Sequence, residues 1–308
     1  MFTKEDFVQM EEHGLTPAAL ETQLKNFREG FPFLPVTRAA SCGDGIRVLD
    51  AAGIEQAAAR YDRAKESLRV VKFVPASGAA TRMFKDLFEF VREGRRTAVV
   101  GELLANRRRF AFWPELRTIV GDDADELRTV ENIVAEGLRY GETPKGLVSF
   151  HRYGDEVRKA VEEHLVEGAQ YAAAGGEVKI HFTVSPEHLT RFEALLAEKI
   201  PGYESRFGVK YRISFSVQDP STDTLAVNPD CTPFRRADGR LLFRPAGHGA
   251  LIGNLGKIDA DIVFVKNIDN VTTDARRGDT VLYKKALAGV LLALQLSLIH
   301  ISEPTRRS

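Results

Sequence analysis

The chain has 308 residues, 44% of them hydrophobic, and its 43 lysines and arginines are balanced by 43 aspartates and glutamates. This is the composition of a folded globular protein, and the balanced charge excludes a general electrostatic attraction to nucleic acid or to an anionic membrane. With 2 cysteines, neither a disulfide framework nor a thiolate metal cage is indicated. No secretory signal pattern opens the chain and no apolar run approaches the length needed to cross a bilayer, so we expect a cytoplasmic protein.

Residues 1–69 are predicted to form a helical N-terminal cover. Thr16 is a suitable N-cap and Pro17 fits the first position of a helix, after which apolar residues recur at helical spacing. A short helix is expected before Thr16, and another amphipathic stretch runs from about Ile54 to Leu68.

Residues 70–295 are predicted to form an α/β domain. Its first buried strand is the β-branched run Val70–Val74, which is followed by a loop of small residues and by a helix from about Met83 to Glu93. Residues from about 95 to 140 show mostly helical patterning, which indicates a helical insertion.

Strands and helices alternate regularly after this insertion. The expected elements are a strand at Leu147–Phe150, a helix at Asp155–Ala173, a strand at Glu177–Val184, a helix at Pro186–Glu198, and strands at Tyr211–Val217 and Ile262–Val265. Strands separated by such helices need crossover connections, which predicts a mostly parallel sheet covered on both faces. Active sites on such sheets lie at the carboxyl ends of the strands.

The last residues, 296–308, differ in kind from the rest of the chain. The run from Leu296 to Arg306 matches one translated reading frame of a transposase-based sequencing adaptor. We therefore expect that the genuine sequence stops near Gln295, inside an apolar helix from Ala286 to Leu294, and that the natural chain continued beyond it. The alternative is a native polar tail.

The segment Ser77-Gly78-Ala79-Ala80-Thr81-Arg82 joins the first strand to its helix. Small residues between a strand and a helix present free backbone N–H groups and the positive end of the helix dipole, which together bind phosphate. Arg82 can fork onto phosphate oxygens, and Lys85 supplies a second positive charge. The alternative is an ordinary strand-to-helix turn with a solvated arginine and lysine.

Three further segments contain residues suited to phosphate or nucleotide chemistry. Lys145 precedes an expected strand, the segment Gly247-His248-Gly249 precedes the strand at Ile262–Val265, and Asp269 falls just past the end of that strand. A carboxylate at that end can hold Mg²⁺ against phosphates. Taken singly, each has a simpler alternative: a surface lysine, a tight turn and a turn-forming Asp-Asn pair.

The order of these segments resembles that of the UDP-sugar pyrophosphorylase group of nucleotidyltransferases. A loop ending in Thr-Arg, a Pro-Lys pair ahead of a strand, a Gly-His-Gly segment and an Asn-x-Asp-Asn segment follow one another in that group, and do so here over about residues 70–285. Gln218 also stands where the group tends to place a glutamine. The resemblance implies a Rossmann-like sheet of the nucleotide-diphospho-sugar transferase (GT-A-like) type.

Along its whole length the chain is similar to an uncharacterised bacterial family known only as a domain of unknown function. The shared blocks are Lys72–Ala80 and Lys266–Val271. This similarity implies no activity, so the chemistry has to be inferred from the motifs.

The pyrophosphorylase resemblance implies that an NTP, with UTP favoured, is joined to a sugar 1-phosphate with release of pyrophosphate. Arg82, the amides from Gly78 to Thr81 and Lys85 would hold the β- and γ-phosphates, and Lys145 would neutralise the attacking phosphate or the α-phosphate. Asp269 would bind Mg²⁺, while Gln218 and the Gly247–Gly249 turn would line the base and ribose pocket.

The chain departs from the group's pattern in two ways, and the first favours binding over turnover. Ala79 and Ala80 stand where the group has glycines, and each added methyl narrows the space against a triphosphate. Lys145 lies about sixty residues beyond Arg82, far more than in the group, so tertiary folding must return it to the site.

Two other functions stay open. A glycosyltransferase would use an Asp-x-Asp metal motif, but Asp259-Ala260-Asp261 precedes its strand, which is the wrong end for the site. A non-catalytic protein that senses nucleotides or sugar nucleotides is the third possibility. No nucleic acid or membrane partner is expected, and the run Arg107–Arg109 is interpreted as a solvated helix face.

Overall fold

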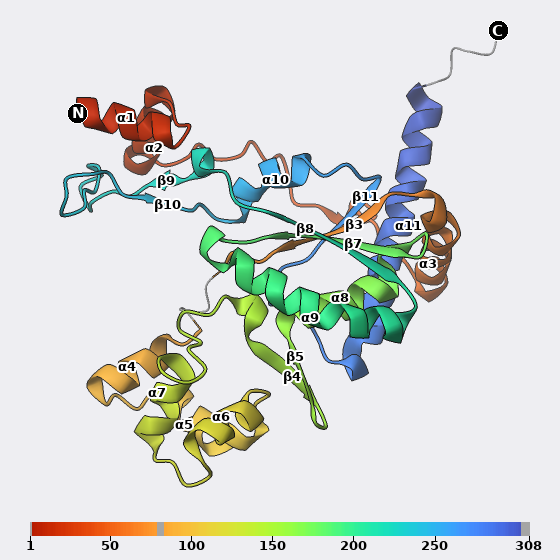
Figure 1. Cartoon of the computed structure of the whole chain (residues 1–308). Helices are drawn as coiled ribbons and strands as arrows, with labels where there is room; N and C mark the ends of the chain where they lie inside the picture. Colours follow the sequence, from red (N-terminus) through yellow and green to blue (C-terminus); the bar gives the residue numbers. More distant parts are fainter. Residues whose placement is uncertain (1, 79–82, 303–308) are drawn as a thin grey trace. The chain divides into compact units, whose positions relative to one another are not determined.

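The computed structural model describes residues 2–78 and 83–302, which form two compact units (Figure 1). The smaller unit comprises residues 1–50 and 217–258, and the larger unit comprises residues 51–216 and 259–308. Ala79, Ala80, Thr81 and Arg82 of the expected phosphate loop lie outside the described residues.

The smaller unit is built from short elements around an apolar cluster. They are α1 (Lys4–Glu12), α2 (Pro17–Glu29), β1 (Ser41–Cys42), β2 (Gly45–Ile46), η6 (Pro220–Thr222), β9 (Thr224–Leu225), β10 (Phe243–Arg244), η7 (His248–Leu251) and α10 (Ile252–Gly256). Thr16 accepts a hydrogen bond from the amide of Ala19 and Pro17 opens α2, which confirms the expected helix start. Leu20 and Leu24 of α2 pack on Leu225 and Leu241, so this helix is held by residues about 200 positions later.

The larger unit contains the main sheet and a group of helices outside it. In chain order its elements are α3 (Ala51–Ala64), η1 (Lys65–Ser67), β3 (Val70–Pro75), α4 (Lys85–Glu93), α5 (Ala98–Asn106), η3 (Arg107–Arg109), α6 (Trp113–Val120), α7 (Glu126–Val134), η4 (Lys145–Leu147), β4 (Ser149–Tyr153), β5 (Glu156–Lys159), α8 (Ala160–Tyr171), β6 (Ala173–Ala174), β7 (Glu177–Thr183), η5 (Pro186–His188), α9 (Leu189–Phe207), β8 (Lys210–Ser216), β11 (Ile262–Val265), η8 (Asp274–Arg276) and α11 (Arg277–Ser302).

The main sheet is mixed, with a parallel part. Among the described residues, β11, β3, β7 and β8 lie in that order and run parallel, with Val71 opposite Val263, Phe73 opposite His181, and His181 opposite Ser214. The short strand β6 pairs antiparallel with the start of β7. The α/β class and the strands at β3, β7, β8 and β11 are therefore as the sequence predicts, whereas the sheet is smaller and more mixed than expected.

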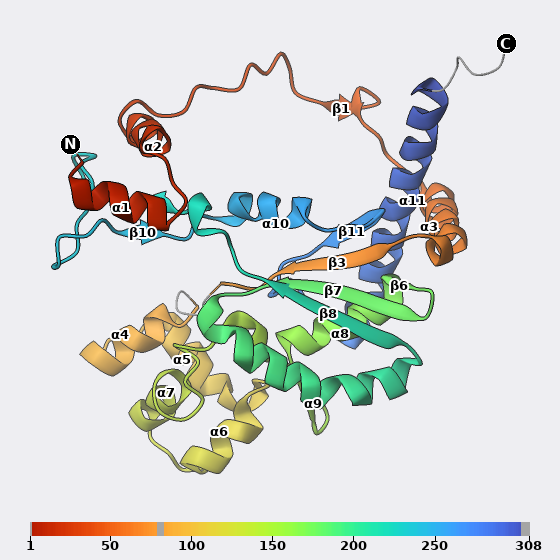
Figure 2. The ribbon, with the colours of Figure 1, turned by 45° about the horizontal axis from the view of Figure 1, so that its top comes forward.

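Helices of the larger unit pack on one face of this sheet. Because alternate residues of a strand point to the same side, Val70, Val74, Ile180 and Phe264 share a face. The helices α8 and α9 cover its β7 side, and α3 and α11 cover its β11 side (Figure 2). All six residues of β3 are buried, so both faces of this strand are covered, as the sequence predicts.

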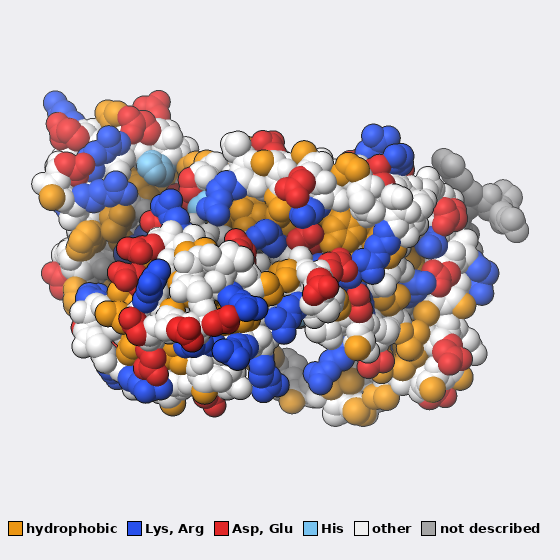
Figure 3. Space-filling view, turned by 60° about the horizontal axis from the view of Figure 1, so that its bottom comes forward, with side chains coloured by type: hydrophobic (Ala, Val, Ile, Leu, Met, Phe, Trp, Pro, Cys, Tyr) orange, Lys and Arg blue, Asp and Glu red, His pale blue; other side chains and the backbone are white. Residues whose placement is uncertain are grey.

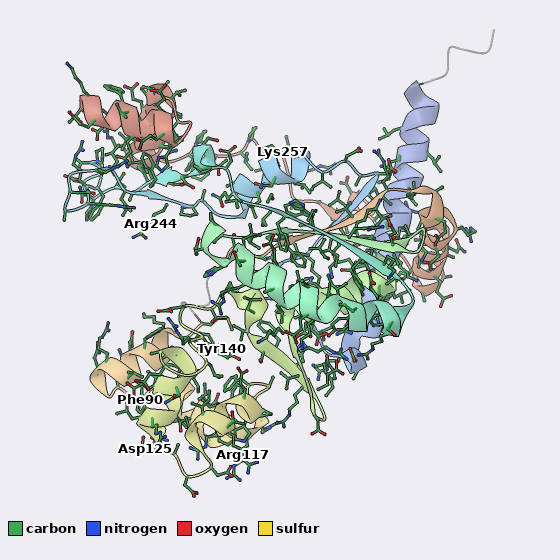
Figure 4. All side chains as sticks on the ribbon, viewed as in Figure 1. Phe90, Arg117, Asp125, Tyr140, Arg244 and Lys257 are labelled. Carbon is green, nitrogen blue, oxygen red and sulfur yellow. The ribbon has the colours of Figure 1, made fainter. Side chains whose placement is uncertain are left out.

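The predicted helical insertion is confirmed and has a core of its own. Helices α4 to α7 bury an apolar cluster that includes Trp113, Leu116 and Ile133. Tyr140 lies where these helices meet the rest of the unit (Figure 4), and its hydroxyl accepts a hydrogen bond from the buried amide of Ser149 at 3.3 Å. This contact connects the insertion to β4.

The segment after Lys145 differs from the prediction. The expected strand at Leu147–Phe150 is a 3₁₀ turn followed by β4, and β4 pairs antiparallel with β5 instead of joining the main sheet. The expected helix at Asp155–Ala173 starts only at Ala160, because Gly154, at φ +63°, closes a hairpin between β4 and β5. The residue pattern of 149–159 predicted a strand and a helix start, so it did not indicate a hairpin.

Helix α11 corrects the expectation that no apolar segment is long enough to cross a bilayer. The stretch Asp274–Leu298 is long and apolar enough to cross a bilayer, and 22% of its most apolar part is buried. Helices in the core of a protein can be equally long and apolar, and α11 packs against α3 through Ala286 and Ala288. The expected localisation therefore stays a prediction.

The contact between α3 and α11 is tight enough to test. A Cβ at Gly289 would lie 1.8 Å from the carbonyl oxygen of Ala57, whereas a Cβ at Gly202 of α9 would meet nothing within 4 Å. We expect Gly289→Ala to lower the free energy of unfolding by about 1–3 kcal/mol, since the helices must separate. Gly202→Ala, the matched control, should raise it by about 0.5–1 kcal/mol because alanine is the better helix former. Urea unfolding of both variants measures this, and equal effects would contradict the packing described.

Candidate functional site

Lys145 and Asp269 form an ion pair although they lie 124 residues apart in sequence. The Nζ atom of Lys145 is 2.5 Å from Oδ2 of Asp269, and their side chains remain 26% and 37% exposed. Lys145 opens the turn η4, and Asp269 follows β11. Two residues singled out independently in the sequence therefore meet at the carboxyl edge of the main sheet.

Hydrogen bonds bring four loops together at this edge. The amide of Lys145 donates to the carbonyl of Gly78 at 3.3 Å, and the amide of Ile268 donates to the carbonyl of Pro75 at 3.1 Å. The hydroxyl of Ser185, after β7, donates to the carbonyl of Ser77 at 3.2 Å. The loop after β3 is thus in contact with the loops around Lys145, Asp269 and Ser185.

Gly146 allows the close approach of η4 to this edge. A Cβ at this position would lie 2.5 Å from the ring of Phe192 and 3.2 Å from Cγ1 of Ile268. A side chain here would push the turn away from the loop that carries Asp269. The glycine that follows Lys145 is therefore required for the ion pair.

A buried cluster of charges lies behind the Asp269 loop. Glu167 of α8 accepts hydrogen bonds from Lys72 of β3 at 3.0 Å and from Lys266, just after β11, at 2.6 Å. Burial lowers the pKa of Lys72 to about 7, although Glu167 opposes the shift. Burial by itself would raise the pKa of Glu167, but Lys72, together with His164 and Lys266, lowers it to about 2. One carboxylate thus connects two strands and a helix.

His164 fixes the Asp269 loop directly. Its Nε2 atom lies 3.1 Å from the carbonyl oxygen of Ile268, and its Nδ1 atom is buried with no hydrogen-bond partner among the described residues. Burial, and then the charge of Lys72, hold the pKa of His164 well below its usual value. The ring is therefore neutral and donates from Nε2 to the loop.

A second buried network holds the chain that follows this loop. Its members are Glu163 on α8, His151 and Tyr153 on β4, Arg158 on β5, Asp274 on η8, and Arg277 at the start of α11. Tyr153 donates to Glu163 at 2.7 Å, and Arg277 pairs with Glu163 while donating to the carbonyl of Thr272 at 2.9 Å. Residues on both sides of Asp269 are therefore anchored to α8.

Other predicted site residues lie elsewhere. Lys85 is on α4 with its side chain 77% exposed and pairs with Glu89 at 3.7 Å. Gln218 belongs to the smaller unit, where its amide donates to Asp223 at 3.5 Å. The turn Gly247–Gly249 also belongs to the smaller unit, at the start of η7. A role of these residues in one pocket with Lys145 and Asp269 stays a prediction.

The Asp-x-Asp sequence has a structural role at the other end of β11. Asp261 accepts hydrogen bonds from the amide and the guanidinium of Arg69, and Asp259 pairs with the same guanidinium. Both carboxylates therefore precede the strand, away from the edge where Asp269 lies.

The residues that support the site from behind have no strong signal in the sequence. Lys72 stands inside an apolar strand, and Glu163, His164 and Glu167 lie on α8, where every residue from Ala160 to Gly168 is buried. A lysine in a buried strand signals a buried partner, since an isolated charge in the interior is too costly. Lys72 therefore indicates a buried partner, but the sequence does not identify that partner as Glu167.

Magnesium binding at Asp269 stays a prediction, because the carboxylate is paired with Lys145. No group of three or more His, Cys, Asp or Glu side chains suited to a metal occurs among the described residues. Mg²⁺ commonly takes one or two carboxylates and completes its octahedron with water and substrate phosphates. Asp269 supplies one such carboxylate, which Lys145 now occupies, so a cation would have to displace the lysine.

Comparison with known proteins identifies the family. A family model described as Domain of unknown function (DUF4301) matches residues 3–305. The chain belongs to this family. No curated protein and no solved structure matches the chain. The resemblance of this DUF4301 member to pyrophosphorylases therefore rests on the order of its motifs alone.

The buried cluster predicts how stability depends on pH. Folded Lys72 loses its proton near pH 7, whereas an unfolded lysine keeps it to about pH 10.5. Between these values the unfolded chain binds more protons, so the free energy of unfolding should rise with pH, by up to about 1.4 kcal/mol per unit. Lys72→Met should remove this part of the slope, which urea unfolding between pH 7 and 9.5 measures. Lys179→Met, an exposed control on β7, should keep the wild-type slope, and an unchanged slope in Lys72→Met would refute the assignment.

Proposed function

We propose that this DUF4301 chain is a nucleotidyltransferase that joins an NTP, with UTP favoured, to a sugar 1-phosphate. An oxygen of the sugar phosphate forms a bond to the α-phosphorus of the NTP, and the bond from that phosphorus to the bridging oxygen breaks, so that pyrophosphate leaves. The observation that carries the proposal is the Lys145–Asp269 pair at the carboxyl edge of the sheet, beside the loop after β3.

The fold supports this assignment. The first strand of the α/β domain, β3, lies between β11 and β7 in the parallel part of the sheet, so loops from three neighbouring strands reach one edge. Ligands of open α/β sheets bind outside the carboxyl ends of the strands. We therefore propose a Rossmann-like, GT-A-like ancestry for this sheet.

In phosphoryl transfer the protein acts mainly by positioning the reacting groups and by neutralising the charge on the phosphates. In the proposed site Lys145 leaves Asp269 and turns its ammonium to the α-phosphate or to the attacking phosphate. Asp269 would then hold Mg²⁺, which supplies charge neutralisation across the phosphates when bound. The amides after Gly78 and the side chain of Arg82 are proposed to hold the departing pyrophosphate, and Lys85, Gln218, Gly247, His248 and Gly249 keep their expected binding roles as part of this proposal.

The exchange of partners by Lys145 and Asp269 is inexpensive. Partly exposed ion pairs contribute only about 0–1 kcal/mol, because water screens them and competes for both groups. Binding of a triphosphate offers Lys145 a stronger partner at little cost in stability. The buried cluster behind the loop, in contrast, keeps Asp269 in place during the exchange.

A nucleotide-sensing protein is the second candidate. Ala79 and Ala80 stand where the pyrophosphorylase group has glycines, and their added methyl groups would favour binding without turnover. The glycosyltransferase alternative is weaker, because Arg69 engages both carboxylates of the Asp-x-Asp sequence. UTP binding without pyrophosphate release, across a panel of sugar 1-phosphates, would favour the sensor.

Variants of the ion pair test the enzyme proposal. Lys145→Met and Asp269→Asn should each lower kcat/KM for pyrophosphate release by about 100-fold or more, as for loss of one charge-stabilising group. Their thermal stability should hardly change, since the pair is partly exposed.

Two matched controls separate catalysis from structure. Lys199 is also an ion-paired lysine, 2.9 Å from Glu198, and Asp261 is 37% exposed and paired with Arg69. Lys199→Met and Asp261→Asn should keep wild-type activity. Full activity in either variant of Lys145 or Asp269 would refute the proposal, and an equal loss of pyrophosphate release in Asp261→Asn would show that the effect is not specific to the Lys145–Asp269 pair.

A further inference from the structure

The larger unit contains a pocket away from the Lys145–Asp269 pair. It encloses about 680 Å³ between the helical insertion and β4. Its walls are mainly apolar and include Phe84, Leu87, Leu103, Phe112, Val148 and Phe150. Pockets of this size and character accommodate small organic ligands.

Part of the apolar lining is exposed to solvent. The side chains of Met83, Val99 and Phe110 line the pocket and are 49%, 55% and 37% exposed. Met83 lies just before α4, Val99 lies on α5, and Phe110 follows η3. The exposed apolar surface is therefore continuous with the pocket. Contiguous exposed apolar surface of this kind marks binding sites on soluble proteins.

Two charged side chains also line the pocket and are not paired with each other. Arg109 and Glu102 form no ion pair within 4 Å with any described residue. The guanidinium of Arg109 donates one hydrogen bond, to Asn106 at 3.4 Å, which leaves most of its donors for another partner. Arginine in such a position matches the planar geometry of carboxylates, sulfonates and phosphates.

We propose that this pocket binds a small amphipathic anion, a compound with an aromatic or acyl body and one anionic group. The apolar body occupies the space between α4, α5 and β4, and the anionic group is bound by Arg109. Glu102 repels the same group and so moderates the affinity. The proposal does not depend on the nucleotidyltransferase assignment, because neither Lys145 nor Asp269 lines the pocket.

A matched pair of fluorescent probes tests the proposal on the full chain. 8-Anilinonaphthalene-1-sulfonate carries a sulfonate, and N-phenyl-1-naphthylamine has the same rings without charge. We expect saturable binding of the sulfonate at one site, with the neutral probe at least about 10-fold weaker, as expected from loss of a charge-assisted hydrogen bond.

Charge variants test the role assigned to Arg109. Arg109→Ala should weaken the sulfonate about 10-fold and leave the neutral probe unchanged, and Glu102→Gln should strengthen the sulfonate several-fold. Arg108, on the same 3₁₀ turn, is exposed and does not line the pocket, so Arg108→Ala is the control and should change neither affinity. Equal effects of Arg109→Ala and Arg108→Ala would overturn the assignment.

A filling variant tests the location. Because Val99 is half exposed, Val99→Trp should fill the pocket without disturbing the fold, which thermal unfolding checks. Binding of both probes should then be lost. Sulfonate binding at wild-type affinity in Val99→Trp would place the probe elsewhere, for example on the exposed leucines of α11, and would overturn the proposal.

Discussion

The buried ion cluster of Lys72, Glu167 and Lys266 is the constraint on which the candidate site depends. One carboxylate serves two ammonium groups in the interior, where an unpaired charge is too costly to persist. The three residues therefore have to stay together, and they belong to β3, α8 and the end of β11. This fixes the two strands against the helix and also fixes the starting point of the loop that carries Asp269.

The other residues of the site lie progressively closer to solvent than this buried cluster. His164 holds the carbonyl of Ile268, Gly146 lets η4 approach, and Lys145 meets Asp269 where solvent reaches both side chains. The buried part of the site is thus held by several contacts, and its outer ion pair is partly exposed. The proposed phosphate chemistry would use both features, because it requires accurately placed charge that can be transferred to the ligand.

The helical insertion lengthens the chain between the loop after β3 and Lys145 without separating them. Its helices bury their own core, and the Tyr140–Ser149 contact fastens it to β4, so the chain returns to the sheet edge at η4. Acidic and basic side chains intermingle on the face shown in Figure 3, in line with the balanced composition. Local charge at Lys145, and not the net charge, is what serves the proposed chemistry.

The sequence by itself determined the α/β class, the strands at β3, β7, β8 and β11, and the helices at α2 and the insertion. These have strong local signals: β-branched runs, a Thr-Pro helix start and sustained apolar periodicity. It also singled out Lys145 and Asp269. Only the tertiary structure decided that these two meet, that β4 and β5 form a separate hairpin, and that Glu167 is the partner of Lys72. The pairs Lys145–Asp269 and Lys72–Glu167 join residues 124 and 95 positions apart, which no local pattern encodes. The β4–β5 hairpin is local, but its antiparallel pairing apart from the main sheet was settled only by the tertiary structure.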